Sequence, residues 1–251
     1  METIKVAILG ASGYTGIELV RLLLAHPHAQ ITAATSRASA GNRIDEMFPR
    51  FAHLTGSELS FMEPDMEAVA RTGAKIAFLA LPHGTAADYA NELLAKGIRV
   101  IDLSADFRLR EASTYEEFYG GTHPAPDLLQ QAIYGLPEVY SREIATASLV
   151  ASPGCYPTSI LIPLLPLLRE GLIEPGTIIA NSLSGVSGAG RKAELPLLFV
   201  ECNESVRAYG LPKHRHLSEI EQELSIAAGQ KVTITSVSYT HLRAHETPEH
   251  R

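Results

Sequence analysis

The sequence predicts an α/β fold with a doubly wound parallel sheet, followed by a domain of α+β character. Short apolar runs typical of buried parallel strands alternate with helical patterns as far as residue 158. Beyond that residue the alternation gives way to a long helix and more widely spaced strands. We therefore expect one part at residues 1–152 and a second part that begins at residue 153 and reaches about residue 237.

Composition narrows the class of protein. The 251 residues are 45% hydrophobic and 20% charged, as in soluble globular proteins. The net charge of −7, without a long basic run, argues against a nucleic-acid partner. Residues 1–9 lack a signal-peptide layout and no apolar run reaches about 18 residues, so we expect no membrane partner. The two cysteines, Cys155 and Cys202, imply no disulfide framework and favour a reducing, cytoplasmic location.

The first strand and the loop after it resemble a Rossmann-type dinucleotide site. Residues 4–9 form an apolar run, residues 10–16 read GASGYTG, and a helical pattern follows at once. Gly10 would allow the tight turn, Gly13 the approach of a pyrophosphate, and Gly16 the close packing of helix and strand. The spacing departs from the commoner G-x-G-x-x-G, and a structural glycine turn is the alternative. The expected cofactor contacts in this loop are Gly10, Ser12, Gly13, Tyr14, Thr15 and Gly16.

The end of the second strand indicates which dinucleotide binds. The strand is expected at residues 31–34 and continues into Thr35, Ser36 and Arg37, with no acidic residue between positions 19 and 44. A carboxylate here would accept the ribose hydroxyl of NAD, whereas hydroxyls and a guanidinium bind a 2′-phosphate. We therefore predict NADP, with Ser36 and Arg37 as contacts. The alternative is that Arg37 is a solvated loop residue.

The third strand, expected at residues 75–81, runs into Pro82, His83 and Gly84. Ligands of such sheets lie beyond the carboxyl ends of the strands, so we expect Pro82 to border the cofactor. His83 is a catalytic candidate, but a structural turn histidine is the favoured interpretation on general grounds.

The fourth strand, expected at residues 98–103, leads to Asp106 and Arg108 at the same edge of the sheet. The Arg108 guanidinium is a candidate for bidentate hydrogen bonding to an anionic substrate. A local Asp–Arg pair of little consequence is the alternative. Residues 111–140 carry several tyrosines among acids and glycines, and we expect them to form a segment that covers the cleft.

A cysteine follows the fifth strand, which is expected at residues 147–151. Residues 152–158 read SPGCYPT, and Pro157 suits the first position of a helix. Cys155 would then lie just ahead of the helix N-terminus, where unpaired N–H groups and the helix dipole favour a negative charge. A thiol in that field is more readily deprotonated, which makes Cys155 a candidate nucleophile. The alternative is a small buried cysteine that is inert.

The second part of the chain begins with a helix to about residue 169, broken or bent near Pro163 and Pro166. A strand is expected at residues 177–183, followed by the loop SGVSGAGR at residues 184–191. Such a loop can present N–H groups to a phosphate or an oxyanion, although a flexible linker is also compatible with it. The expected contacts are Ser184 with the substrate, and Ser187 and Gly188 with the cofactor.

Two histidines precede the last predicted helix, at residues 218–228, within the segment LPKHRH at residues 211–216. His-x-His can bind a metal, but no other cluster has ligand-like spacing, so we predict no metal site. A histidine brought against the cysteine would serve as its acid/base partner. Ser218 and Glu221 resemble a capping box, and a strand is expected at residues 231–237.

Together these motifs resemble the N-acetyl-γ-glutamyl-phosphate reductase family of arginine biosynthesis. The matches occur in the family's order and cover residues 4 to about 235. The matching segments are GASGYTG at 10–16, LPHG at 81–84, ADFRL at 105–109, YGLPE at 134–138, PGCYPT at 153–158, SGVSGAGR at 184–191 and HRHLSEI at 214–220.

The resemblance implies a reaction and roles for particular residues. It implies NADPH-dependent reduction of N-acetyl-γ-glutamyl phosphate to the semialdehyde, with phosphate release through a cysteine thioester. The nucleophile then maps onto Cys155. The acid/base maps onto His214, because the spacing from the cysteine favours the first of the two histidines. His216 is expected to contact the substrate. By analogy with related semialdehyde dehydrogenases, Arg108 would hold the leaving phosphate. Intact family members are expected to be homo-oligomers, dimers or tetramers.

The resemblance stops near the end of the chain, which implies that the α+β catalytic and dimerisation domain at residues 153–237 is incomplete. Residues 238–251 resemble translated adapter sequence that ends some metagenomic reads, so we expect a truncated gene product with a disordered tail; a genuine divergent ending is the alternative. We do not interpret His241, His245 and His250 as a metal site. Two other functions stay open, which are a reductase of the related aminoadipyl or aspartyl phosphate and an inactive NADP-binding fragment.

Overall fold

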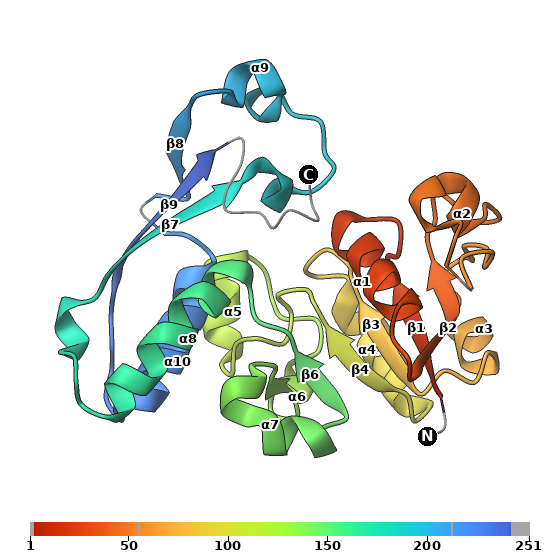
Figure 1. Ribbon diagram of the computed structural model, residues 1–251. Helices are drawn as coiled ribbons and strands as arrows, with labels where there is room; N and C mark the ends of the chain where they lie inside the picture. Colours follow the sequence, from red (N-terminus) through yellow and green to blue (C-terminus); the bar gives the residue numbers. More distant parts are fainter. Residues whose placement is uncertain (1–2, 55, 212, 242–251) are drawn as a thin grey trace. The chain divides into compact units, whose positions relative to one another are not determined.

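The computed structural model describes residues 3–54, 56–211 and 213–241. The chain forms two compact units, Met1–Pro153 and Gly154–Arg251, and each is described here by itself. In Figure 1 the first unit runs from red to green and the second from green to blue.

Six parallel strands form the sheet of the first unit, in the order β2-β1-β3-β4-β6-β5. The chain starts in the interior of the sheet and builds outward on both sides of β1, which confirms the predicted doubly wound parallel sheet. The strands are β1 Ile4–Leu9, β2 Ala29–Thr35, β3 Ile76–Leu79, β4 Arg99–Asp102, β5 Ile133–Tyr134 and β6 Leu149–Ala151.

The two faces of this sheet bury separate apolar clusters because successive side chains of a strand point to opposite faces. In β1, Ile8 joins a cluster with α1 and the segment that contains Phe51 and Phe61. Its neighbours Ala7 and Leu9 instead join a cluster with α3 and α4. The helices of the unit are α1 Tyr14–Leu24, α2 Ile44–Met47, α3 Met66–Arg71, α4 Ala86–Ala95, α5 Ala112–Tyr119, α6 Pro126–Leu129 and α7 Pro137–Thr146.

The sheet contains one strand more than the five expected from the sequence. The extra strand is β5, which pairs with β6 and lies inside residues 111–140, a stretch predicted as a single crossing segment. The same stretch also holds α5 and α6. Strand β5 has only two residues, Ile133 and Tyr134, so it is too short to show the alternation that identifies a strand in a sequence.

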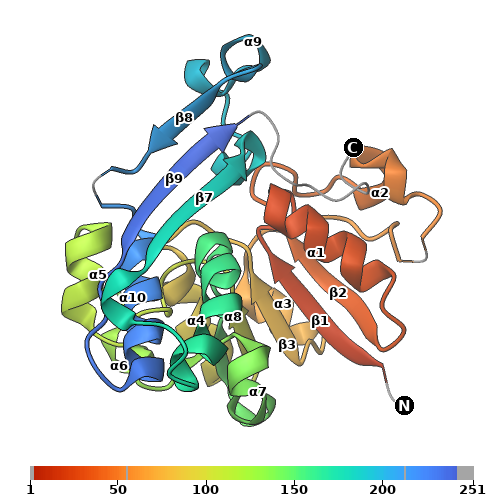
Figure 2. The same ribbon diagram turned by 60° about the vertical axis from the view of Figure 1, so that its left-hand side comes forward.

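The second unit combines two packed helices with a three-stranded sheet (Figure 2). Helix α8 (Cys155–Arg169) packs along α10 (His216–Ala228). In the sheet, β9 (Thr235–His241) lies between β7 (Ile179–Gly185), to which it is parallel, and β8 (Val206–Tyr209), to which it is antiparallel. A short helix, α9 (Phe199–Cys202), precedes β8. This arrangement agrees with the α+β character expected for the second part of the chain.

The sequence predicts a break or a bend near Pro163 and Pro166, and α8 continues through both prolines, so no break occurs there. Both prolines lie on the exposed side of the helix, as do Ser159 and Ile162, whose carbonyls lose their helical donors. Water can hydrate those carbonyls, and the buried side of α8 keeps its hydrogen bonds.

The capping box predicted for α10 is also wrong. The helix begins at His216, so Ser218 already lies inside its first turn and its hydroxyl donates to the carbonyl of Arg215. Glu221 instead accepts the N–H of Ile234. The sequence pattern missed this start because the histidines ahead of Ser218 carry no helix signal of their own.

The last strand lies further along the chain than expected. The prediction was residues 231–237, whereas β9 spans Thr235–His241 and pairs with β7 from Ile179 to Gly185. It therefore includes the first four residues of the tail that the sequence led us to expect as disordered. The rest of that tail, residues 242–251, lies outside the described residues.

A buried carboxyl at the end of β4 makes the stability of the fold depend on pH. Asp102 is fully buried and accepts hydrogen bonds from the N–H (2.9 Å) and hydroxyl (2.7 Å) of Ser104. Burial raises its pKa from 3.8 to about 7, and the bonds to Ser104 oppose this only in part. Between these two pKa values the folded chain binds more protons than the unfolded chain, so the free energy of unfolding falls as pH rises.

We expect Asp102→Asn to remove much of this pH dependence. The midpoint of thermal unfolding of the wild type should fall between pH 5 and pH 8, and the variant should flatten that fall by about 3 °C or more, because it has no proton to lose. Thermal melts at four pH values measure this. The exposed Asp88→Asn serves as the control and should keep the wild-type slope. Equal slopes for the wild type and Asp102→Asn would exclude the assignment.

Candidate active site

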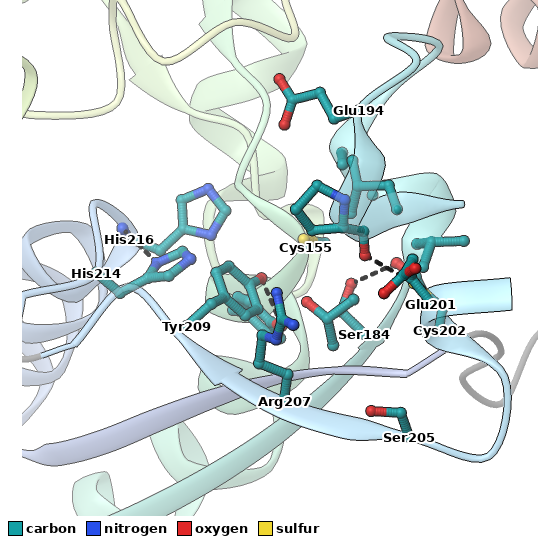
Figure 3. A pocket seen from close by; sticks show the side chains of 18 of the residues that line it. Cys155, Ser184, Glu194, Glu201, Cys202, Ser205, Arg207, Tyr209, His214 and His216 are labelled. Atoms are coloured by element: carbon teal, nitrogen blue, oxygen red, sulfur yellow. Dashed lines mark hydrogen bonds between the residues drawn. The ribbon is translucent and has the colours of Figure 1, made fainter. Parts of the chain in front are cut away.

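A cavity of about 550 Å³ opens in the second unit and gathers most of the residues expected to carry chemistry there. Cys155, Ser184, Gly188, His214 and His216 all line it, and Figure 3 shows four of these side chains around the same hollow. Its volume falls in the range of ordinary small-molecule sites. These residues, which the sequence singled out separately, therefore share one cavity of the second unit, a proximity that the sequence could not show.

Cys155 is the first residue of α8 and is exposed. Gly154 precedes it as the N-cap, and the first hydrogen bond of the helix runs from the N–H of Thr158 to the carbonyl of Gly154, at 2.9 Å. The sequence placed Cys155 ahead of the helix and Pro157 at its first position; in the structure Pro157 is at the third. The thiol consequently lies within the first turn, beside the N-terminal N–H groups of the helix.

His214 lies between two tyrosines just before α10. Its ring centroid is 5.3 Å from that of Tyr156 and 5.4 Å from that of Tyr209, with both contacts edge-on. Burial, and then the positive charge of Arg215, lower the pKa of His214 below its usual value. Its Nδ1 accepts the N–H of His216 at 3.1 Å, so the neutral ring carries its proton on Nε2.

The two tyrosines also bond to each other. The hydroxyl of Tyr209 donates to that of Tyr156 at 2.7 Å, and burial, reinforced by this bond, raises the pKa of Tyr209. The two rings therefore form a wall beside His214. We did not predict this role for either residue, because β8, which carries Tyr209, is only four residues long and shows no clear alternation.

Gly210 leaves the space that His214 occupies. Its φ is +67°, and a Cβ built on it would lie 2.7 Å from Cδ2 of His214 and 3.3 Å from Cβ and Cγ. Those atoms belong to the near end of the imidazole side chain, so the ring would have to move as a whole.

We therefore expect Gly210→Ala to lower kcat/KM about tenfold or more, because a displaced histidine loses its geometry. The matched control is Gly229→Ala at the end of α10, where φ is +65° and nothing lies within 4 Å of the added Cβ. Both variants should lose about 1 kcal/mol of stability from the left-handed backbone, and only the first should lose activity. Steady-state kinetics beside thermal melts separate the two effects, and equal activities would contradict this role of Gly210.

The glycine- and serine-rich segment at the end of β7 has regular secondary structure over much of its length. Strand β7 runs to Gly185, and a 3-10 helix follows over Val186–Ala189. A Cβ on Gly188 would lie 2.9 Å from the hydroxyl oxygen of Ser184, so this glycine allows the turn to close over the cavity wall. The contacts expected of Ser184, Ser187 and Gly188 with substrate and cofactor remain predictions.

The glycine loop in the first unit fits a bound dinucleotide. Gly10 has φ +80°, and a Cβ on it would lie 2.3 Å from the carbonyl oxygen of Ala80. A Cβ on Gly16 would lie 2.2 Å from the carbonyl oxygen of Gly10, so only glycine permits this packing of loop and helix. Gly13 is the N-cap of α1, and Tyr14 and Thr15 follow it, exposed, in the first turn. A helix N-terminus preceded by such a loop is a favourable site for a pyrophosphate.

The residues expected to read the ribose lie at the end of β2. Ser36 is buried and its hydroxyl lies 2.8 Å from that of Ser12 in the glycine loop. Arg37 is exposed, and its guanidinium donates to the hydroxyl of Tyr89 at 2.7 Å. Pro82, after β3, is exposed near the carboxyl end of the neighbouring strand pair. These positions suit the predicted cofactor contacts, which nonetheless stay predictions.

Arg108 holds the backbone ahead of the cysteine. It is almost fully buried, and its guanidinium donates to the carbonyls of Ser152, at 2.8 Å, and Leu103, at 2.9 Å. Asp106, its sequence neighbour, accepts the N–H groups of Gly84 and Ala87 at the start of α4. Both side chains therefore stabilise loops at the sheet edge, and the substrate contact expected of Arg108 remains a prediction.

Clusters of possible metal ligands and helices able to cross a bilayer are both absent from the described residues. No group of three or more His, Cys, Asp or Glu side chains within residues 3–54, 56–211 and 213–241 is placed to hold a metal. In the same part of the chain, no helix has the length and apolar character that crossing a bilayer requires.

Sequence reasoning missed several residues of the cavity region. Arg207, Tyr209 and Arg215 line the cavity without having been predicted. Glu219 is fully buried on α10. One signal was available for it, since Glu219 is an acid beside Ile220 on the apolar side of an amphipathic helix, and buried carboxylates usually have a specific partner.

Comparison with known proteins identifies both units. The model of the semialdehyde dehydrogenase NAD binding domain matches residues 5–147, and that of the semialdehyde dehydrogenase dimerisation domain matches residues 155–243. The chain is 61% identical over 235 residues to the N-acetyl-gamma-glutamyl-phosphate reductase of Akkermansia muciniphila. It is 53% identical over 239 residues to that of Ectopseudomonas mendocina. Each match covers 94% of this chain and 68% of the relative.

Solved structures of lower sequence identity share the fold. A crystal structure of aspartate semialdehyde dehydrogenase with NADP from Candida albicans superposes with a TM-score of 0.65 at 15% identity, over 95% of this chain and 68% of that one. Aspartate semialdehyde dehydrogenase II of Vibrio cholerae gives a TM-score of 0.65 at 16% identity, over 96% and 71%. At this identity the similarity describes the architecture alone.

Proposed function

The chain belongs to the N-acetyl-γ-glutamyl-phosphate reductase family of oxidoreductases, and we propose that Cys155 and His214 carry out the family's reaction in it. That reaction is the NADPH-dependent reduction of N-acetyl-γ-glutamyl phosphate to N-acetylglutamate 5-semialdehyde, with release of phosphate, in arginine biosynthesis. The resemblance recognised in the motifs is thereby confirmed at the level of the family. The chain spans about two thirds of the length of these relatives.

Cys155 captures the acyl group in the first step of this proposal. The thiolate attacks the carbonyl carbon of the acyl phosphate, the bond from that carbon to the phosphate oxygen breaks, and inorganic phosphate leaves. The product is a thioester on Cys155, which accepts hydride far more readily than a free carboxylate does. The position of Cys155 in the first turn of α8 supports this role, because helix N–H groups favour both the thiolate and the developing oxyanion.

His214 manages the charge on the carbonyl oxygen. Its pKa is lowered, so the ring is neutral at neutral pH, and its proton lies on Nε2 because Nδ1 accepts the N–H of His216. The neutral Nε2–H donates a hydrogen bond to the carbonyl oxygen of the thioester, which becomes negative when hydride adds to the carbonyl carbon. When the thiohemiacetal then collapses, the carbon–sulfur bond breaks, the aldehyde leaves and Cys155 regains its thiolate.

The first unit holds the cofactor in this proposal. Reduced nicotinamide, when bound, supplies the hydride. The loop at residues 10–16 and Pro82 would hold the dinucleotide, and Ser36 with Arg37 would select the 2′-phosphate of NADP, because no carboxylate lies there to repel it. Ser187 and Gly188 would complete the contacts from the second unit.

Substrate contacts and assembly complete the proposal. Arg108 would hold the leaving phosphate. Ser184 and His216, which line the cavity, would contact the rest of the substrate. The dimerisation domain match supports a homo-oligomer, and the biosynthetic role favours a cytoplasmic location.

The observation that carries this function is the cavity that brings Cys155 and His214 together. Its test is phosphate-dependent reduction of NADP with three semialdehydes, which are N-acetylglutamate semialdehyde and the aspartate and aminoadipate analogues. We expect the first to give the highest kcat/KM, although a single methylene separates some substrates by only about 1–3 kcal/mol. A preference for an analogue would reassign the substrate, and cofactor binding without turnover of any of the three would reduce the chain to a binding fragment.

A further inference from the structure

A buried glutamate in the second unit has no role in the mechanism described so far. Glu219 lies on α10 with no exposed surface, and its Oε1 accepts the backbone N–H of Gly154 at 3.0 Å. Burying a carboxyl group is costly unless it makes specific hydrogen bonds. This hydrogen bond is to the residue immediately before Cys155, so the location of Glu219 has chemical consequences.

The N–H groups at the start of α8 can be accounted for one by one. An α-helix leaves four N-terminal N–H groups without an intrahelical acceptor, here those of residues 154–157. Pro157 has no N–H, and that of Gly154 is taken by Glu219. Thr158 donates to Gly154 in the first helical bond. Two N–H groups remain, those of Cys155 and Tyr156, and within the described part of the chain no acceptor is found for either.

We propose that Glu219 is a positioning residue, which holds Gly154 so that the N–H groups of Cys155 and Tyr156 form the oxyanion site for the acyl group on Cys155. This inference rests on the proposed role of Cys155 as nucleophile. A glycine at the N-cap has wide conformational freedom, and the bond from its N–H to a fully buried carboxyl restricts it. The two N–H groups then keep one direction, which is the preorganisation that oxyanion stabilisation requires.

The same hydrogen bond joins the two helix starts that carry the reacting groups. Glu219 lies one turn after His216, the first residue of α10, and Cys155 is the first residue of α8. The Tyr156 ring, next to Cys155, contacts the rings of His214 and His216 at 5.3 and 6.0 Å between centroids. A shift of α10 along α8 would change all these contacts together, and the bond from Gly154 to Glu219 opposes that shift.

The test compares Glu219→Gln with Glu219→Met in the whole chain. The amide oxygen of glutamine can still accept the Gly154 N–H but carries no charge, whereas methionine fills similar volume without a strong acceptor. The readout is the rate at which iodoacetamide alkylates Cys155 between pH 5.5 and 9, followed by peptide mapping, so that Cys202 is counted separately. We expect Cys155 in Glu219→Gln to be alkylated at least as fast as in the wild type. In Glu219→Met the alkylation rate at pH 7 should be lower than in Glu219→Gln by a factor of about five or more, and the midpoint of its pH profile should lie at a higher pH.

A matched control comes from the same helix. Glu223 is also buried, one turn further along α10, and accepts a hydrogen bond from the side chain of Gln222. Glu223→Met removes a buried carboxyl from the same helix and leaves the bond between Gly154 and Glu219 in place. We expect it to leave the alkylation rate of Cys155 within about twofold of the wild type, whereas a purely structural effect of losing a buried acid would slow it as much as Glu219→Met.

A measurement on the unmodified chain keeps the inference open to refutation if the variants fold poorly. Residue-resolved amide exchange should show the N–H of Gly154 protected and those of Cys155 and Tyr156 exchanging faster. A Gly154 amide that exchanges as fast as these two overturns the inference, as do equal alkylation profiles for folded Glu219→Gln and Glu219→Met. If Cys155 of the wild type reacts no faster than an ordinary free cysteine, the proposed function itself fails, and this inference with it.

Discussion

Replacement of Cys155 by serine is expected to lower the rate of acyl-phosphate reduction by about 1,000-fold or more. A serine hydroxyl at the start of α8 does not ionise near neutral pH, so no nucleophile remains to form the covalent intermediate. Losses of this size are typical when a nucleophile is removed. The measurement is phosphate-dependent reduction of NADP with the semialdehyde, carried out at several pH values.

The control for this variant is the second cysteine. Cys202 is buried and its thiol donates to the carbonyl of Pro196 at 3.0 Å, as expected of a structural residue. Cys202→Ser should change kcat by less than about threefold, because no step of the mechanism uses it. If Cys155→Ser kept more than about one tenth of the wild-type rate, the covalent route would be excluded.

The second large effect is expected for His214→Asn, which should lower kcat about 100- to 1,000-fold with a smaller change in KM. The asparagine cannot reproduce the reach of the imidazole Nε2. The pH profile gives a separate readout. Burial lowers the pKa of His214, so the imidazole of the wild type should stay neutral to a pH below the ordinary histidine value of 6.5. The activity of the wild type should therefore fall only below that pH. The variant has no imidazole to protonate, so its activity should not show this fall at acidic pH.

The neighbouring histidine provides the comparison. His216 lines the same cavity, and its backbone N–H, rather than its side chain, holds Nδ1 of His214. His216→Asn keeps that N–H, so its effect should be smaller and should fall mainly on KM. A larger loss for His216→Asn than for His214→Asn would exchange the two assignments.

The fold was predictable because its signals are local and repeated. The strands around Gly10, Pro82 and Ser152 are short apolar runs bounded by turns, and such runs alternating with helices have few stable arrangements. Strand β5 was not predictable, because two residues carry no period. The start of α10 at His216 was missed for a similar reason, since its N-cap Arg215 has no capping side chain.

The site was predictable only in part, for a physical reason. Cys155, Ser184 and His214 belong to short motifs, so the sequence marks them directly. Tyr209 and Glu219 act through contacts between segments far apart in the chain, which are the bond from Tyr209 to Tyr156 and the bond from Gly154 to Glu219. Such contacts depend on how α8, α10 and β8 pack, and one sequence without the structure does not specify that packing.

Covalent capture of the acyl group by Cys155 is tested most directly by mass spectrometry. The chain is incubated with N-acetyl-γ-glutamyl phosphate without NADPH, quenched in acid and digested. The thioester mechanism predicts a single acyl adduct, on the peptide that contains Cys155, which disappears when NADPH is added before the quench. Reduction of the substrate with NADPH, in a chain that never acquires an adduct on Cys155, would contradict it.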